Sequence, residues 1–204
     1  GMCMDAAGNL YISEEYNHTV RKIDKVSGLV STVAGTGSAG FSGDGVMAIA
    51  AKMNQPAGVC VDHSGNIYIA DKGNSRIRKV TTTSGLMSTV AGDTVSGYSG
   101  DGGAATAAKL SFPKGVCTDP AGNIYIADFG NNRIRKVDAT TGVISTFAGT
   151  GVSGYSGDGG TALAATFRNP NNVFMDGHGN LFVSDFGNNV IRKIVPDGHI
   201  TTVA

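Results

Sequence analysis

The stretch GNIYIADFGNNRIRKV at residues 122–137 decides the fold of this chain, because close copies of it recur at a fixed interval. Related strings stand at 65–80 and 179–194, each displaced by 57 residues. The copies span 1–57, 58–114, 115–171 and 172–204, and the second and third share 37 of 57 residues. A tandem repeat of this length predicts one supersecondary unit per copy, which hides its apolar surface against its neighbours.

Each copy contains four short β-branched or aromatic runs. In the second copy these runs lie at 59–61, 67–70, 77–80 and 86–90, and each is closed by Gly, Asn, Asp or Ser. The links between them are short and turn-rich, which predicts hairpins and a four-stranded antiparallel meander. Apolar residues at consecutive positions suit a sheet covered on both faces. The sequence therefore predicts an all-β propeller with blade boundaries after Ala34, Ala91 and Ala148.

A linker of about twenty residues follows each fourth strand, as in GDTVSGYSGDGGAATAAKLSFP at 92–113. A connection this long needs its own structure or function. Its alanine-rich part predicts a short helix over about 104–110, capped by Asp101. The preceding glycines permit positive φ and close backbone approach, which indicates a specified loop conformation.

The repeated strings resemble NHL repeats, whose name-giving Asn-His pair stands here as Asn17-His18. The linker strings GFSGDGV at 40–46 and GYSGDGG at 97–103 and 154–160 are similar to the long-spacer NHL repeats of bacterial extracytoplasmic proteins and of the teneurin propeller. The resemblance covers the whole chain and favours an extracellular or periplasmic location. It implies a fold more than a function, because NHL propellers include protein-binding and RNA-binding modules, and related six-bladed propellers include lyases and lactonases.

Composition argues against two classes of partner. Charged residues make up 16% of the chain and the formal net charge is zero, so there is no general electrostatic attraction for nucleic acid or an anionic membrane. No run approaches the ~18 apolar residues that a membrane-spanning helix needs. We therefore expect neither a nucleic-acid partner nor membrane insertion.

No catalytic constellation is recognisable. The histidines occupy four different repeat positions, and no nucleophile elbow, P-loop or zinc signature is present. Cys3, Cys60 and Cys117 share one position in the first strand, which Phe174 takes in the fourth copy. A position that accepts apolar groups of different size predicts buried core, not a thiol or metal site.

Two acidic positions recur in every copy. The aspartate that opens the first hairpin is explained by an Asx-type turn. A second carboxylate ends the second strand, ahead of an arginine of the third strand, and we expect it to pair with that arginine or with turn amides. These carboxylates are Glu14, Asp71, Asp128 and Asp185, and the arginines are Arg21, Arg78, Arg135 and Arg192. A calcium ion held by the carboxylate ring is the alternative, but hard cations want six or more oxygen ligands, so we predict no metal and no cofactor.

The alternating direction of the strands indicates which face binds a partner. Because consecutive strands run in opposite directions, the turns between second and third strands emerge on the same face as the linkers. This face carries exposed aromatic and charged side chains, which are typical of a partner surface. The predicted binding residues are Glu15, Tyr16, Lys72, Phe129, Phe186, Phe41, Tyr98 and Tyr155. The alternative for the last three is that each pins its linker onto its own blade.

Three classes of function fit these observations. The leading prediction is a non-catalytic binding or scaffold propeller for a protein, peptide or glycan. The alternatives are a lyase- or lactonase-like enzyme with a divalent metal in the central channel, and a structural spacer in a large secreted protein. Because such families commonly close with six blades, we expect these four to form a fragment or an unusual assembly, open to self-association, and not a closed four-bladed ring.

Overall fold

The computed structural model describes all residues from 1 to 204 and confirms an all-β propeller architecture with four antiparallel sheets. Each sheet is a meander in sequence order, and each blade ends at the predicted alanine in the first three copies. Blade 1 contains β1 (Met2–Met4), β2 (Leu10–Glu14), β3 (Thr19–Ile23) and β4 (Val30–Ala34). Blade 2 contains β5 (Pro56–Val61), β6 (Ile67–Asp71), β7 (Arg76–Val80) and β8 (Met87–Ala91). Blade 3 contains β9 (Val116–Thr118), β10 (Ile124–Asp128), β11 (Arg133–Val137) and β12 (Ile144–Ala148). Blade 4 contains β13 (Pro170–Met175), β14 (Leu181–Asp185), β15 (Val190–Ile194) and β16 (Ile200–Thr202).

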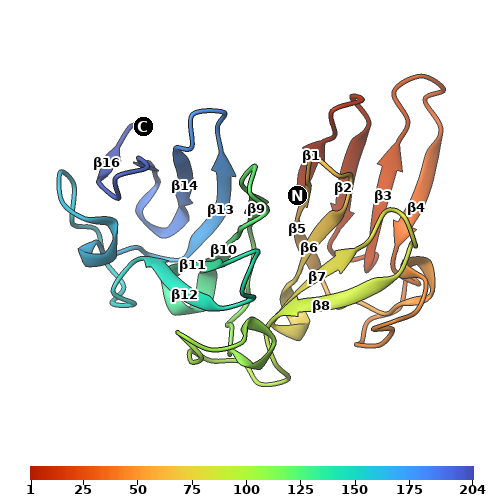
Figure 1. Cartoon of the computed structure of the whole chain (residues 1–204), viewed down its shortest axis with the longest axis horizontal. Helices are drawn as coiled ribbons and strands as arrows, with labels where there is room; N and C mark the ends of the chain where they lie inside the picture. Colours follow the sequence, from red (N-terminus) through yellow and green to blue (C-terminus); the bar gives the residue numbers. More distant parts are fainter.

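The blades are arranged as an open arc, with the first strand of each blade on the inside and the fourth on the outside (Figure 1). Three apolar clusters hold the arc together, and each lies between consecutive blades. The cluster between blades 1 and 2, for example, joins Tyr11 and Val20 to Ile69 and Met87. No cluster joins blade 4 to blade 1, so the arc is not closed into a four-bladed ring.

Aspartates build the turns between first and second strands, as the sequence predicts. Asp62 Oδ1 accepts a hydrogen bond from the backbone N–H of Asn66 at 2.8 Å, and its Oδ2 accepts one from the Asn66 side chain at 2.9 Å. The Tyr68 hydroxyl donates to the same carboxylate at 3.3 Å. The same contacts recur at Asp5 and Asp119, which accounts for the repeated aspartate as a turn residue.

Each linker covers the outer strand of the following blade. The N–H of Gly102 donates to Ile144 O, and the N–H of Ile144 donates to Gly103 O, so the linker extends the β12 edge. The predicted helix over 104–110 is wrong: only one 3-10 turn, η3 (Ala105–Ala107), forms, and it has no side-chain cap. Asp101 cannot act as that cap because its carboxylate binds Arg135. The short helices η1 (Ala48–Ala50) and η5 (Ala162–Ala164) stand at the equivalent linker positions.

The two end blades each expose a face that the other blades bury. Met2 is 73% exposed, whereas Val59 at the same repeat position is 5% exposed. Cys117 is buried and the other two cysteines are partly buried, but Phe174 is 62% exposed. The prediction of a buried position in all four copies is therefore wrong for Phe174, because none of the four blades packs against this face of blade 4.

Candidate functional site

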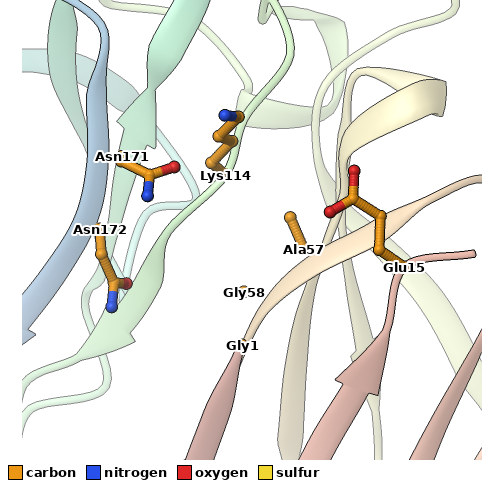
Figure 2. Close-up of a pocket in the computed structure, with 7 residues that line it drawn as sticks. All are labelled: Gly1, Glu15, Ala57, Gly58, Lys114, Asn171 and Asn172. Atoms are coloured by element: carbon orange, nitrogen blue, oxygen red, sulfur yellow. The ribbon is translucent and has the colours of Figure 1, made fainter. Parts of the chain in front are cut away.

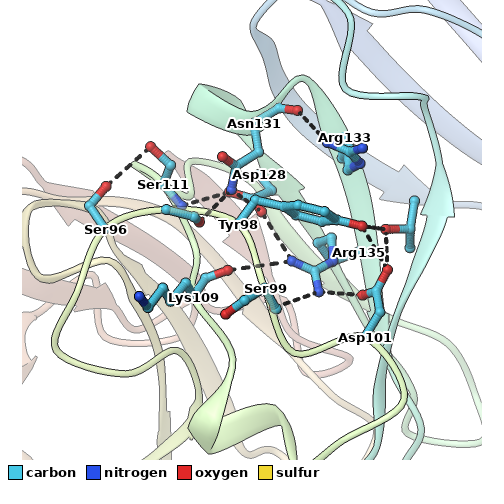
Figure 3. Close-up of polar contacts among 12 residues, drawn as sticks. Ser96, Tyr98, Ser99, Asp101, Lys109, Ser111, Asp128, Asn131, Arg133 and Arg135 are labelled. Carbon is cyan, nitrogen blue, oxygen red and sulfur yellow. Dashed lines mark hydrogen bonds and ion pairs between the residues drawn. The ribbon is translucent and has the colours of Figure 1, made fainter.

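A buried carboxylate organises the turn between second and third strands in each of blades 2 to 4. Asp128 accepts hydrogen bonds from the Ser111 backbone N–H at 2.8 Å and the Asn131 side chain at 2.8 Å, and it pairs with Arg135 Nη1 at 3.4 Å (Figure 3). Desolvation by burial raises the pKa of Asp128 to about 6, although these donors oppose the shift. Equivalent ion pairs join Asp71 to Arg78 and Asp185 to Arg192, and a more exposed pair joins Glu14 to Arg21 at 3.7 Å. The predicted carboxylate–arginine pairing is confirmed.

A second carboxylate on each of these buried arginines comes from the linker. Asp101 pairs with Arg135 and also accepts hydrogen bonds from Thr146 at 2.7 Å and Tyr98 at 2.9 Å (Figure 3). Burial opposes the ionisation of Asp101, but these hydrogen bonds and the Arg135 charge lower its pKa overall. This role was not predicted from the sequence. The feature that could have indicated it is a constant spacing: the aspartate of each SGDG string stands 34 residues before one of these arginines.

The linker aromatics lie against these same arginines. The Arg135 guanidinium lies 4.9 Å from the Tyr98 ring centroid, and Arg192 lies 5.1 Å from that of Tyr155. Phe41 covers Arg78 at 4.7 Å in the same way. Each ring therefore fixes its linker to the following blade, which corrects the expectation that it packs on its own blade. This packing places all three rings on the outer side of the blades, away from the axis.

The axial mouth is a cavity of about 270 Å³ where the inner strands of the four blades meet (Figure 2). Its lining residues are Gly1, Glu15, Ala57, Gly58, Lys114, Asn171 and Asn172. Glycine recurs at the start of the first strand because neighbouring backbones approach closely there: a Cβ on Gly115 would lie 2.6 Å from the Asn172 Cα. The mouth is therefore shaped by backbone packing and chemically defined by the few side chains that point into it.

Charged and aromatic groups converge at the axial mouth. Glu15 and Lys72, which occupy one repeat position in blades 1 and 2, form an ion pair. Phe129 and Phe186 occupy that position in blades 3 and 4, and Lys114 Nζ lies 3.8 Å and 5.9 Å from their ring centroids. Burial, followed by repulsion from Lys72, lowers the pKa of Lys114, while Glu15 opposes this shift. Lys114 has no carboxylate within ion-pair distance, so it is a cation available to an anionic group.

The structure thus divides the predicted binding residues into two groups. Glu15 lines the axial mouth, and Lys72, Phe129 and Phe186 lie beside it through their contacts with Glu15 or Lys114. Tyr16 lies in the same turn as Glu15 but is 83% exposed and is not among the residues that line the cavity. Lys114, Asn171 and Asn172 were not predicted as site residues. The sequence feature that could have indicated them is that Lys114 and Asn171 replace Ala57, and Asn172 replaces Gly58, in otherwise similar copies.

No group of three or more His, Cys, Asp or Glu side chains is arranged so that it could hold a metal ion. His18, of the Asn17-His18 pair, has a structural contact: its Nδ1 accepts a hydrogen bond from the Gln55 N–H at 3.1 Å. In blade 3 the Asn132 side chain accepts the equivalent hydrogen bond from the Asn169 N–H at 2.9 Å. None of the 3-10 turns is long or apolar enough to cross a bilayer.

Four-stranded blades packed around an axis, each carrying the NHL string in its second and third strands, define an NHL-type β-propeller. The chain belongs to the teneurin NHL domain family, whose model matches residues 1–81, 37–97 and 94–156. The match extends over the first three blades and the two linkers that join them.

Relatives share parts of this chain. Teneurin-1 of Mus musculus is 32% identical over 103 residues, which cover 45% of this chain and 4% of the relative. The chloroplastic protein SUPPRESSOR OF QUENCHING 1 of Arabidopsis thaliana is 38% identical over 78 residues, covering 38% of this chain and 7% of that protein. The matched segments are thus a small fraction of these long relatives.

Solved structures share the fold. A structural genomics protein of unknown function from Bacteroides thetaiotaomicron superposes with a TM-score of 0.76 at 24% identity, over 99% of this chain and 46% of that one. A streptogramin B lyase superposes with a TM-score of 0.64 at 16% identity, over 99% of this chain and 53% of that one. The chain therefore spans about half the length of these structures, and at such identities the likeness concerns the fold alone.

Proposed function

We propose that this chain is a non-catalytic binding propeller that holds a protein, peptide or glycan partner at the axial mouth. The observation that carries the proposal is where the repeats differ. Copies two and three share 37 of 57 residues, yet the positions at the mouth carry Lys72 and Phe129 in these copies, and Glu15 and Phe186 in the others. A surface of unlike groups built on near-identical blades favours a specific ligand over a purely structural role.

The contacts at the axial mouth favour a partner with an anionic group beside an apolar one. Lys114 lacks a carboxylate partner and is partly desolvated, so a carboxylate bound there gains a charge-assisted hydrogen bond. Phe186 is 58% exposed and offers an aromatic surface next to that cation. A peptide with a free carboxylate next to an apolar side chain supplies both groups.

A displayed library of peptides with free C-terminal carboxylates tests this proposal. Peptides that bind saturably should bind the Lys114→Gln and Phe186→Ala variants about tenfold more weakly than the parent protein. The same peptides with an amidated C-terminus should bind the parent protein more weakly by a similar factor. Val26→Ser, on the turn between β3 and β4 at the opposite face, is the matched control and should bind normally. The proposal is refuted if the selected peptides bind both Lys114→Gln and Phe186→Ala with the affinity of the parent protein. Chemical conversion of a bound peptide would refute the proposal that the propeller is non-catalytic.

A further inference from the structure

A second cavity, of about 400 Å³, lies on the outer side of blade 2, between the linker that covers this blade and the linker that leaves it. We call it the blade 2 pocket. It shares no lining residue with the axial mouth, so it is a separate site. The side chains that define it are Phe41, Asp44, Arg76, Asp93, Thr94 and Thr106.

The blade 2 pocket contains a buried cation without a partner. Arg76 is only 7% exposed, and its guanidinium lies 3.8 Å from the Phe41 ring centroid. Arg78 pairs with Asp44 at 2.7 Å, but Arg76 has neither a carboxylate within ion-pair distance nor a hydrogen-bond acceptor. A buried guanidinium with no acceptor is costly, and an anionic group that enters the pocket relieves this cost.

Blade 3 shows why this arginine is left unpaired. Its counterpart Arg133 donates through Nη2 to Thr150 O at 2.5 Å. The next residue is Gly151, with φ +85°, where a Cβ would lie 1.8 Å from Arg133 Nη1. In blade 2 this position is Thr94, which carries a Cβ and does not adopt a positive φ. The place that the guanidinium occupies in blade 3 is therefore closed to Arg76.

The polar residues around this arginine are departures from the repeat. Asp93 and Thr94 replace a Thr-Gly pair that stands in copies one and three, and Thr106 replaces Ile49 and Leu163. All three of these polar residues line the blade 2 pocket, although they come from two separate parts of the linker. Because copies two and three are otherwise so alike, changes that converge on one cavity favour a ligand over chance variation.

The remaining groups in the pocket indicate what else the ligand carries. Asp93 Oδ1 accepts the Val95 N–H at 2.7 Å, which leaves its Oδ2 as an acceptor for a ligand hydroxyl. The Thr106 hydroxyl can donate or accept. Asp44 and Asp93 repel a second negative charge, which disfavours a phosphate dianion. Phe41 is 42% exposed and offers an apolar surface beside these polar groups.

We propose that the blade 2 pocket binds a sugar acid, that is, a pyranose with a single carboxylate. The carboxylate binds the guanidinium of Arg76, and the ring hydroxyls bind Asp93 and Thr106. The apolar face of the sugar packs against Phe41. A pocket of about 400 Å³ accommodates one such ring.

An NMR titration of the isotope-labelled protein with D-glucuronate at constant ionic strength tests this proposal. D-Glucuronate should bind saturably and shift the amide signals of residues 92–95 and 104–107. D-Glucose, which lacks the carboxylate, should bind at least about tenfold more weakly. Phe186→Ala, at the axial mouth, should bind D-glucuronate normally, which separates this proposal from the proposed function.

Two variants test the role of the unpaired arginine. Arg76→Gln should weaken D-glucuronate binding about tenfold, whereas Arg133→Gln, the matched change in blade 3, should leave it unchanged. Thr94→Gly should also weaken binding about tenfold, because it opens to Arg76 the place that Arg133 occupies. Its melting temperature should stay close to that of the parent, since blade 3 carries glycine there. The proposal is overturned by absence of saturable shifts up to about 10 mM, by equal affinity for D-glucose, or by normal binding in both Arg76→Gln and Thr94→Gly.

Discussion

Asp128 shows how a single buried carboxylate fixes a turn of this propeller. It accepts hydrogen bonds from Ser111, Asn131 and Arg135 at once, and all three groups can only donate at these contacts. Asp128→Asn places an amide N–H against one of these donors and leaves it unpaired. We expect a loss of roughly 1–3 kcal/mol in the free energy of unfolding at pH 7.5, measured by urea denaturation. An unchanged midpoint would show that the carboxylate does not support the turn.

The same residue predicts a pH dependence of stability. Burial raises the pKa of Asp128 from 3.8 to about 6, so the native state binds a proton more tightly than the unfolded chain does between these values. This contribution to stability is complete below pH 3.8 and is lost as pH rises through about 6. The stability difference between parent and Asp128→Asn should therefore shrink from pH 4.5 to pH 7.5. Urea melts of both proteins across that range measure it, and a difference that grows with pH would contradict the assignment.

Among the elements, the linkers are the least regular and the most constrained. Gly100 has φ +91°, and a Cβ there would lie 2.6 Å from the Ala108 Cβ, whereas Gly102 has φ +82° and open space around it. Gly102→Ala should cost about 1 kcal/mol, because only the left-handed backbone is strained. Gly100→Ala should cost at least about 2 kcal/mol more, because it also overpacks the linker. Thermal denaturation of both variants measures these costs. Equal losses of stability in Gly100→Ala and Gly102→Ala would show that Ala108 and its neighbours shift to accommodate the added methyl group.

The strands and blade boundaries could be predicted from the sequence because they depend on local, repeated signals. β-branched runs and turn residues recur every 57 residues, so each copy supports the assignment made in the others. The conformation of residues 104–110 could not be predicted from such local signals. Its alanines favour a helix locally, but backbone hydrogen bonds to the β12 edge and the Arg135 contact hold the linker extended beside a single 3-10 turn.

The axial mouth could be predicted only in part, because it forms where distant segments converge. Strand parity identified Glu15, Lys72 and the two phenylalanines, since all four share one turn position. Lys114 stands just before a first strand and reads as the end of a linker. Only the packing of inner strands around the axis brings it to the two aromatic rings.

For the whole molecule, the open ends of the arc predict self-association. Met2 on blade 1 and Phe174 on blade 4 lie on the two halves of an interface that the chain forms three times internally. We expect light scattering to show a molar mass that rises with concentration, and Phe174→Asp to reduce this rise by placing a charge in the contact. A mass independent of concentration in the parent would contradict this prediction.

Binding of the partner on the face that contains the axial mouth can be tested by hydrogen–deuterium exchange, with and without a carboxylate peptide selected from the library. The bound peptide should slow exchange in the turns at 72–75, 129–132 and 186–189, and leave exchange in the opposite turns at 62–66, 119–123 and 176–180 unchanged. Slowed exchange confined to the opposite turns would contradict binding at the axial mouth.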